Sequence, residues 1–155
     1  MNPVNILSLN EVRKKLHLEE EIVRISITDW DINEHTFISG KYIKASLCLE
    51  FCDVTYHEVK KNKEFSVFQE SLFSWEQARQ VIDFLKKYID FPLVVNCLAG
   101  ISRSSAIGKI ACQLKGIDDS WIRLPRYNPN PYVLQLLQNQ VLLQHQEYCS
   151  DKFSK

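Results

Sequence analysis

The stretch FPLVVNCLAGISRSSA, residues 91–106, decides the predicted fold. Its first part, Phe91–Asn96, is short, apolar and β-branched, which is typical of a strand buried on both faces of a sheet. The residues LAGISR follow Cys97 and lead into a helical segment. That segment is expected to end at Gly116, because glycine is common just beyond a helix C-terminus. A buried strand joined to a helix by a short loop is a building unit of α/β sheets.

Two further strands are predicted upstream of this unit. They cover residues 21–28 (EIVRISIT) and 42–52 (YIKASLCLEFC), where β-branched or alternating apolar residues are frequent. In the second strand, alternation places Leu47, Leu49 and Phe51 on one face. Two polar segments are predicted to be solvated loops, residues 29–40 and the KKNK cluster at 60–63.

Three further helices are predicted from their N-terminal signals. Ser8 with Glu11, and Ser74 with Gln77, match the capping box, in which two side chains three residues apart satisfy each other's backbone N–H groups. Asn130–Pro131 is an N-cap residue followed by proline at the first helical position. These helices are expected to end near Leu18, Asp90 and Tyr148, respectively.

The whole chain predicts one α/β domain, residues 1–155. A chain of 155 residues can bury a core without disulfides or a metal. Strands alternating with helices predict a central, mostly parallel sheet flanked by helices on both faces. Lys and Arg total 19, as do Asp and Glu, so the formal net charge is zero. This balance argues against general binding to nucleic acid or to anionic membranes, which normally needs a basic excess.

The sequence also predicts a cytoplasmic protein. No apolar run approaches the roughly 18 residues that a membrane-spanning helix needs. The first residues, MNPVNILSLNEVRKK, lack the basic-then-apolar order of a signal peptide. The five cysteines are odd in number, and their spacings suggest no secreted disulfide framework.

The loop after Cys97 has the residues that phosphate chemistry needs. A loop between a buried strand and a helix N-terminus can aim several backbone N–H groups at one anion. Gly100 allows a backbone conformation that a Cβ disfavours, and Arg103 offers a planar fork for two phosphate oxygens. The same positive surroundings favour a nucleophilic thiolate at Cys97. Ser104 can place a hydroxyl near that sulfur and help it to leave.

CLAGISRS, residues 97–104, resembles the Cys-x5-Arg-Ser/Thr signature of the protein-tyrosine/dual-specificity phosphatase superfamily. VVNCLAGISRSSA and NPNPYVLQLL are similar to small members from bacteria and their viruses. The resemblance implies the α/β fold of that superfamily, a phosphocysteine intermediate, and no metal or organic cofactor. It implies phosphorylated protein or peptide substrates, carrying phosphotyrosine with phosphoserine and phosphothreonine as further candidates. The phosphate-binding loop would consist of Leu98, Ala99, Gly100, Ile101, Ser102 and Arg103.

The reaction also needs an acid to protonate the leaving oxygen. Superfamily members carry an Asp just after a strand, and Asp53 matches that position. Asp29 and Asp31 are the next candidates. The alternative is that Asp53 only stabilises a turn, since short polar side chains favour such places.

One residue departs from the superfamily pattern. Asn96 stands where the residue before the cysteine is usually His, and Asn can hydrogen-bond but cannot carry a positive charge. A slower enzyme is expected for this reason. A pseudophosphatase that binds phosphopeptides without hydrolysing them is the alternative function.

Two other interpretations concern residues outside the loop. Asn130 lies in the turn YNPNP, which the superfamily brings near the phosphate loop, but a simple helix cap is the preferred interpretation. A set with loosely zinc-like spacing consists of Cys48, Cys52, His145 and Cys149. Burial in the core is the preferred interpretation for Cys48 and Cys52, which share one strand face.

Overall fold

The centre of the protein is a sheet of parallel strands. A computed structural model describes residues 2–15, 20–29, 42–54, 58 and 71–153. Within these ranges the sheet has four strands, in the order β1-β4-β2-β3, and every neighbouring pair is parallel. The strands are β1 (Val4–Ser8), β4 (Leu93–Cys97), β2 (Ile22–Thr28) and β3 (Ile43–Glu50). The predicted single α/β domain with a parallel sheet is confirmed.

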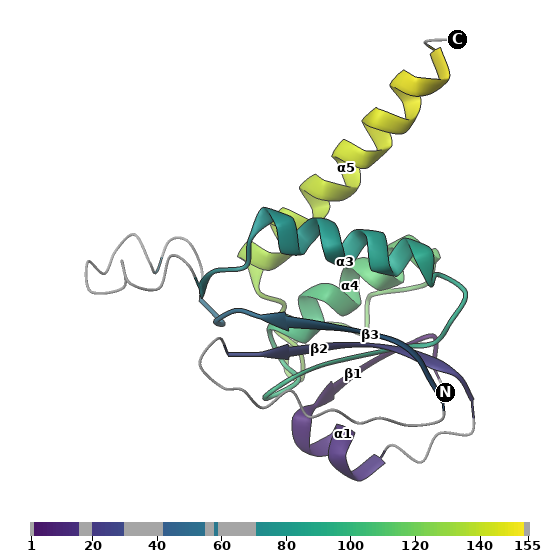
Figure 1. The fold of residues 1–155 in the computed structure, drawn as a ribbon. Helices are drawn as coiled ribbons and strands as arrows, with labels where there is room; N and C mark the ends of the chain where they lie inside the picture. The colour runs from purple at the N-terminus through teal and green to yellow at the C-terminus, as the bar shows by residue number, and fades with distance from the viewer. Residues whose placement is uncertain (1, 16–19, 30–41, 55–57, 59–70, 154–155) are drawn as a thin grey trace.

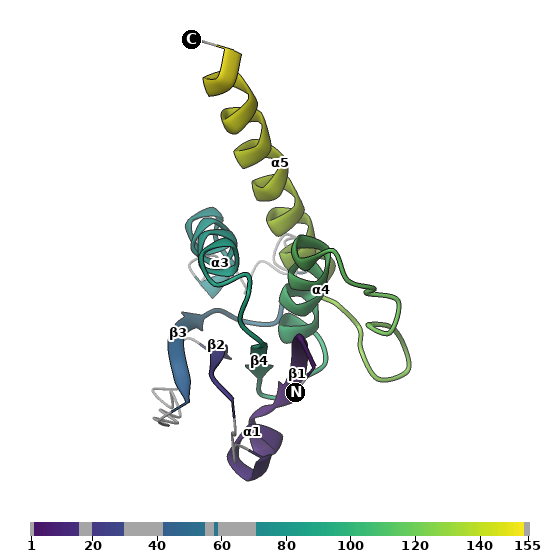
Figure 2. The ribbon, with the colours of Figure 1, turned by 90° about the vertical axis from the view of Figure 1, so that its right-hand side faces the viewer.

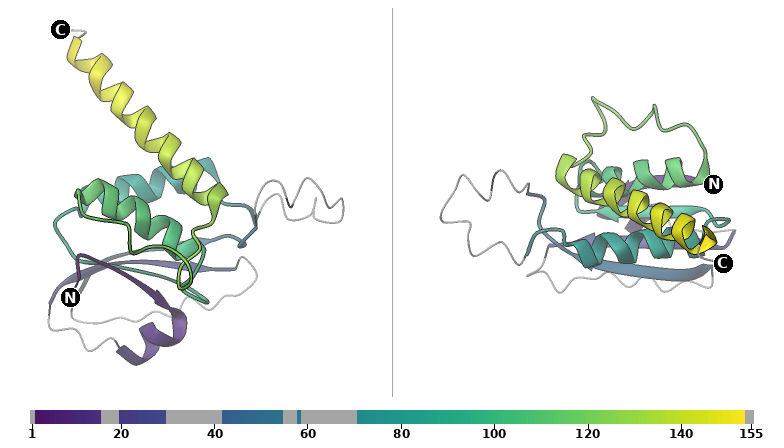
Figure 3. Two further views of the ribbon diagram at one scale, coloured as in Figure 1. Left: turned by 180° about the vertical axis from the view of Figure 1, so that it is seen from behind. Right: turned by 90° about the horizontal axis from the view of Figure 1, so that it is seen from above.

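Helices cover both faces of this sheet, as predicted. The short helix α1 (Leu9–Lys15) lies against one face, and α3 (Trp75–Lys87) and α4 (Arg103–Lys115) lie against the other (Figures 1 and 2). The long helix α5 (Pro131–Phe153) packs against α3 and α4, and its C-terminal half extends past the rest of the fold (Figures 1 and 3). None of the helices in the described ranges has the length and apolar character to span a bilayer.

Strand β4 is the most enclosed element, as its apolar sequence predicts. All five of its residues are buried. Val95 and Cys97 face the main core under α3 and α4, whereas Val94 faces a smaller core that it forms with Val12 and Ile22 beneath α1. The central position between β1 and β2 explains why β4 needs apolar residues on both faces.

The capping predictions are confirmed in atomic detail. The Ser8 N–H donates to Glu11 Oε2 at 2.8 Å, and the Glu11 N–H donates to Ser8 Oγ at 3.2 Å. Ser74 and Gln77 form the same reciprocal pair at the start of α3. Gly116 ends α4 in the left-handed conformation, at φ 67°.

The helix ends were predicted less well. Helix α3 ends at Lys87 rather than near Asp90, because the chain turns there and the Phe91 N–H bonds to the Tyr88 carbonyl before β4 begins. Helix α5 continues to Phe153 instead of ending near Tyr148, since no Gly or Pro follows to stop it. Helix α1 is described only to Lys15.

Strand β1 was not predicted. Its five residues, VNILS, include two polar side chains, and only Val4 and Ile6 show the alternation of a strand. Both are 3% exposed, because they pack into the main core although β1 is the edge strand beside β4. Three predicted features lie outside the described residues, namely the loop predicted over 29–40 apart from Asp29, the candidate acid Asp31 and the KKNK loop at 60–63.

Candidate active site

Parallel strands bring three candidate residues to one edge of the sheet. Asp29 follows β2, Asp53 follows β3 by three residues, and Cys97 is the last residue of β4. Because the carboxyl ends of parallel strands share one edge, these residues meet although they are far apart in sequence. Direct contacts with the loop after β4, described below, confirm that they lie together.

Cys97 lies at the bottom of this loop with two potential donors beside its sulfur. The Gly100 N–H donates to Sγ at 3.2 Å, and the Ser104 hydroxyl lies 3.2 Å from the same atom. Cys97 is 2% exposed. A hydroxyl can act as donor or acceptor, so Ser104 can donate to the sulfur as the Gly100 N–H does.

The loop conformation requires glycine at position 100. Gly100 has φ 71°, a region that residues with a Cβ rarely adopt. A Cβ there would also lie only 2.5 Å from the Ser8 nitrogen and 2.6 Å from the Leu7 carbonyl carbon. The Leu9 N–H donates to the Leu98 carbonyl at 3.2 Å on the same side. The loop therefore packs tightly on the junction between β1 and α1.

The N-terminus of α4 is open toward the loop. Ser102 occupies the N-cap position but makes no side-chain cap hydrogen bond. Its hydroxyl donates instead to Asp53 Oδ1 at 2.8 Å. The first-turn N–H groups therefore lack the usual side-chain acceptor, and such groups bind anions readily. Leu98 and Ile101, which are 60% and 45% exposed, give the mouth of the loop an apolar border.

Arg103 is buried and fixed from one side. Its Nη1 donates to Asp29 Oδ1 at 2.6 Å and to the Phe51 carbonyl at 2.8 Å. The residue is 4% exposed. Its buried Nε has no hydrogen-bond partner among the described residues. Since buried charged donors are normally paired, this atom indicates a place for an acceptor that binds in the loop. Asp29, the second candidate acid, is thus a partner of the arginine.

Asp53 is held by two neutral donors on one oxygen. Besides the Ser102 hydroxyl, Asn130 Nδ2 donates to Oδ1 at 2.9 Å. Asn130 Oδ1 meanwhile accepts the Tyr132 and Val133 N–H groups at 3.0 and 3.2 Å, so the predicted helix cap is confirmed. The link from Asn130 to Asp53 was not predicted, because nothing in the turn YNPNP indicates which side chain its amide meets.

Asn96 points away from the sulfur. Successive side chains of a strand alternate, and the Asn96 side chain lies on the face that α1 covers. There Arg24 Nε donates to Asn96 Oδ1 at 3.0 Å. Arg24 was not singled out in the sequence, since an arginine within a strand ordinarily faces solvent.

The zinc alternative gains no support within the described ranges, where no three His, Cys, Asp or Glu residues form a metal-binding group. Cys149 has no described side chain. Burial was also the wrong prediction for Cys48, which is exposed. It lies on the strand face opposite Leu47 and Leu49, which pack on the main core.

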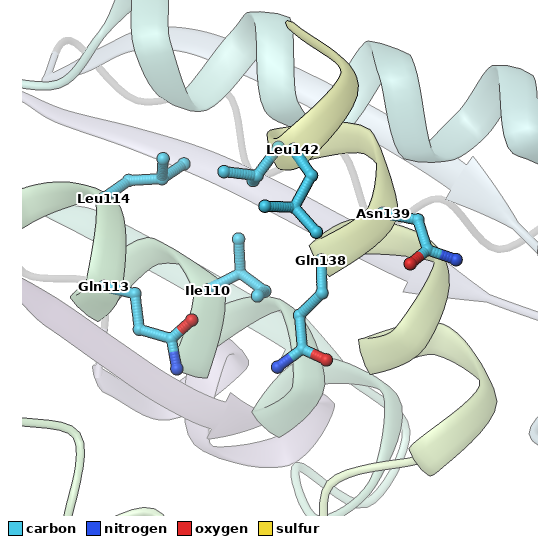
Figure 4. A pocket seen from close by; sticks show the side chains of 7 residues that line it. Ile110, Gln113, Leu114, Gln138, Asn139 and Leu142 are labelled. Atoms are coloured by element: carbon cyan, nitrogen blue, oxygen red, sulfur yellow. The ribbon is translucent and has the colours of Figure 1, made fainter. Parts of the chain in front are cut away.

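A hollow lies between α4 and α5. Its volume is about 420 Å³, and the labelled side chains come from both helices (Figure 4). Leucine, isoleucine, valine and amide side chains line it: Ile110, Gln113, Leu114, Gln138, Asn139, Val141 and Leu142. None of these groups titrates or acts as a nucleophile, so the hollow offers no catalytic chemistry.

No protein-family model matches this chain, and no curated protein matches it at a significant level.

Proposed function

We propose that this protein is a cysteine-dependent phosphatase of the protein-tyrosine/dual-specificity type. The observation that carries the proposal is a thiol with an N–H and a hydroxyl 3.2 Å from its sulfur, beside a buried guanidinium and an uncapped helix N-terminus. A phosphate dianion in the loop would accept from the first-turn N–H groups and from Arg103 Nε. Its phosphorus would then face the Cys97 sulfur.

The first step transfers the phosphoryl group to the enzyme. The Cys97 thiolate attacks phosphorus, an S–P bond forms and the bond to the leaving oxygen breaks. Asp53 gives its proton to that oxygen, so the alcohol or phenol leaves neutral. The hydrogen bonds from Ser102 and Asn130 both reach Oδ1, so we assign the transferable proton to Oδ2.

The second step hydrolyses the phosphocysteine. A water molecule attacks phosphorus while the Asp53 carboxylate takes a proton from that water. The S–P bond breaks, and inorganic phosphate is released. The Ser104 hydroxyl, 3.2 Å from the sulfur, donates to the departing thiolate. Arg103 and the loop N–H groups stabilise the equatorial oxygens in both transition states. The residues present need no metal or organic cofactor for this chemistry.

The loop favours phosphate esters on protein side chains as substrates. Its exposed side chains, Leu98 and Ile101, are apolar, and none of the residues 98–102 is basic. A polyanionic substrate would gain little here, whereas the ring of phosphotyrosine could contact the apolar border. Phosphotyrosine is therefore the first candidate, with phosphoserine and phosphothreonine next.

A phosphopeptide-binding pseudophosphatase is the second candidate function. Asp53 Oδ1 accepts from both Ser102 and Asn130, so this carboxyl can serve to hold the loop and the start of α5 rather than to protonate a leaving group. Binding needs only the loop and Arg103. The two functions therefore differ in whether Asp53 transfers a proton to the leaving group or only holds the loop.

Hydrolysis of p-nitrophenyl phosphate in the presence of EDTA tests the proposal. We expect turnover that EDTA leaves unchanged and that vanadate inhibits, because vanadate adopts the five-coordinate geometry of the transferring phosphoryl group. Tight binding of a phosphotyrosyl peptide without any turnover between about pH 5 and 8 would replace the enzyme by the binding module.

The loss of kcat caused by Asp53→Asn should depend on the leaving group of the substrate. Loss of the acid is expected to lower kcat about 100-fold for phosphoserine peptides, whose leaving oxygen needs a proton, and far less for substrates with acidic phenols. Asp29→Asn is the matched comparison, since it releases Arg103 Nη1 and should raise KM for all substrates alike. Steady-state kinetics on a series of aryl and alkyl phosphates separates the two. If Asp29→Asn shows the leaving-group dependence instead, the acid is Asp29.

A further inference from the structure

A positively charged side chain is buried on the sheet face opposite the main core. Arg24 lies within β2 and is 3% exposed, whereas its neighbours Val23 and Ile25 belong to the main core. Helix α1 covers the side that Arg24 faces, and its Val12 anchors the smaller core there. Burial lowers the pKa of the Arg24 guanidinium, and nearby Cys48 opposes that shift. A buried cation costs free energy, so its contacts call for an explanation.

The contacts of Arg24 lead to the strand that carries the thiol. Its Nε donates to Asn96 Oδ1 at 3.0 Å, and its Nη2 donates to Ser26 Oγ at 3.2 Å. Ser26 and Asn96 are direct partners in the β2–β4 register, and Asn96 Nδ2 lies 3.5 Å from Ser26 Oγ. Ser26 is 3% and Asn96 is 1% exposed. The three side chains thus form a buried polar cluster, which we call the Arg24 cluster.

The Arg24 cluster and the thiol share one strand end. Asn96 directly precedes Cys97, and their side chains point to opposite faces of β4. The peptide between them is therefore fixed on one side by the cluster and leads on the other into the phosphate-binding loop. A contact that holds Asn96 also holds the direction from which Cys97 enters that loop.

We propose that Arg24 is a positioning residue for Cys97 and acts through Asn96. Its guanidinium fixes the end of β4 and places a cation behind the strand that carries the sulfur. Both effects favour a thiolate in the loop. Asn96 cannot carry a charge itself, but the Arg24 guanidinium that bonds to its side chain can. The proposal rests on the proposed function, because it takes Cys97 as the nucleophile.

The test is the rate at which iodoacetamide alkylates Cys97 between about pH 5.5 and 9, which follows the thiolate fraction. Peptide mass spectrometry separates Cys97 from the other cysteines. Arg24→Met and Asn96→Ala are each expected to slow the reaction about tenfold at low pH and to match the wild type at high pH. The double variant should be no slower than the slower single one, because both remove the same contact.

Four controls accompany these variants. Ser26→Ala removes another partner of Arg24 but keeps the bond to Asn96, so it should stay within about twofold of the wild type. Arg24→Lys keeps the charge without the Nε donor and should fall between the wild type and Arg24→Met. Burial, with Asp119 and Asp118 adding to it, raises the pKa of Cys112 to about 11, so alkylation of this residue reports unfolding. Arg103 and Asp29 are the same in every variant, and Cys48→Ser in the Arg24→Met background checks that the nearby Cys48 does not cause the change.

Wild-type alkylation rates in folded Arg24→Met and Asn96→Ala, or strictly additive losses in the double variant, would overturn the proposal. If Arg24→Met does not fold, a rate for Arg24→Lys equal to that of the wild type overturns it. Failure of the proposed function would look different, since a wild type without turnover could still show this alkylation pattern. If the wild type turns over substrate but substitution of Arg24 leaves the alkylation rate unchanged, the proposed function stands and the role of Arg24 is overturned.

Discussion

Cys97→Ser is expected to lower kcat for p-nitrophenyl phosphate by at least about 10,000-fold, since removing a nucleophile costs nearly all covalent catalysis. A serine hydroxyl is a far weaker nucleophile at neutral pH than a cysteine sulfur. The Gly100 N–H and the Ser104 hydroxyl would face an oxygen that cannot attack. Binding should survive, because Arg103 and the helix N-terminus are unchanged. Fluorescence polarisation with a labelled phosphotyrosyl peptide measures this binding.

The matched control is Cys48→Ser, which changes an exposed cysteine on β3 in the same way. It should keep wild-type kcat. Turnover retained by Cys97→Ser would exclude the phosphocysteine mechanism. It would indicate direct hydrolysis by a water molecule that Asp53 activates. Loss of both turnover and peptide binding, with an unchanged melting temperature, would instead mean that the sulfur is needed for the loop to form.

Short-range features of this fold were predictable because local sequence determines them. The two capping boxes, the Asn130 cap and the left-handed Gly116 each depend on residues within one turn of a helix. The buried strand β4 was visible because it is apolar on both faces. The loop from Cys97 to Ser104 could be located for the same reason, since its residues are contiguous.

Contacts between distant segments could not be predicted from local patterns. The Arg103–Asp29 pair spans 74 residues, and the Asn130–Asp53 bond spans 77. Both depend on the strand order β1-β4-β2-β3, which no residue pattern states. The edge strand β1 was missed because its five residues carry too little alternation. Arg24 was missed because its burial results from α1, whose position on the sheet is a tertiary feature.

Arg103→Lys is expected to lower kcat/KM about 1,000-fold, because the loss of donors aimed at a transition-state oxyanion costs about that much. In contrast to Cys97→Ser, it should weaken binding of phosphate and vanadate as well. The arginine meets Asp29 and the Phe51 carbonyl through Nη1 and still offers Nε to a ligand. A lysine has one nitrogen and no planar fork, so it cannot satisfy both sides at once.

Arg126→Lys is the matched control for this substitution. Arg126 bonds to Glu11 at 3.3 Å on the surface, where its side chain is 64% exposed. Surface pairs contribute little, so kcat/KM should stay within about twofold of the wild type. The measurements are kcat/KM, the inhibition constants of phosphate and vanadate, and the melting temperature. If Arg103→Lys folds and keeps all three kinetic constants within about tenfold, the anion is held by the loop N–H groups alone. Arg103 Nε would then not bind the phosphate, and the guanidinium would have a structural role only.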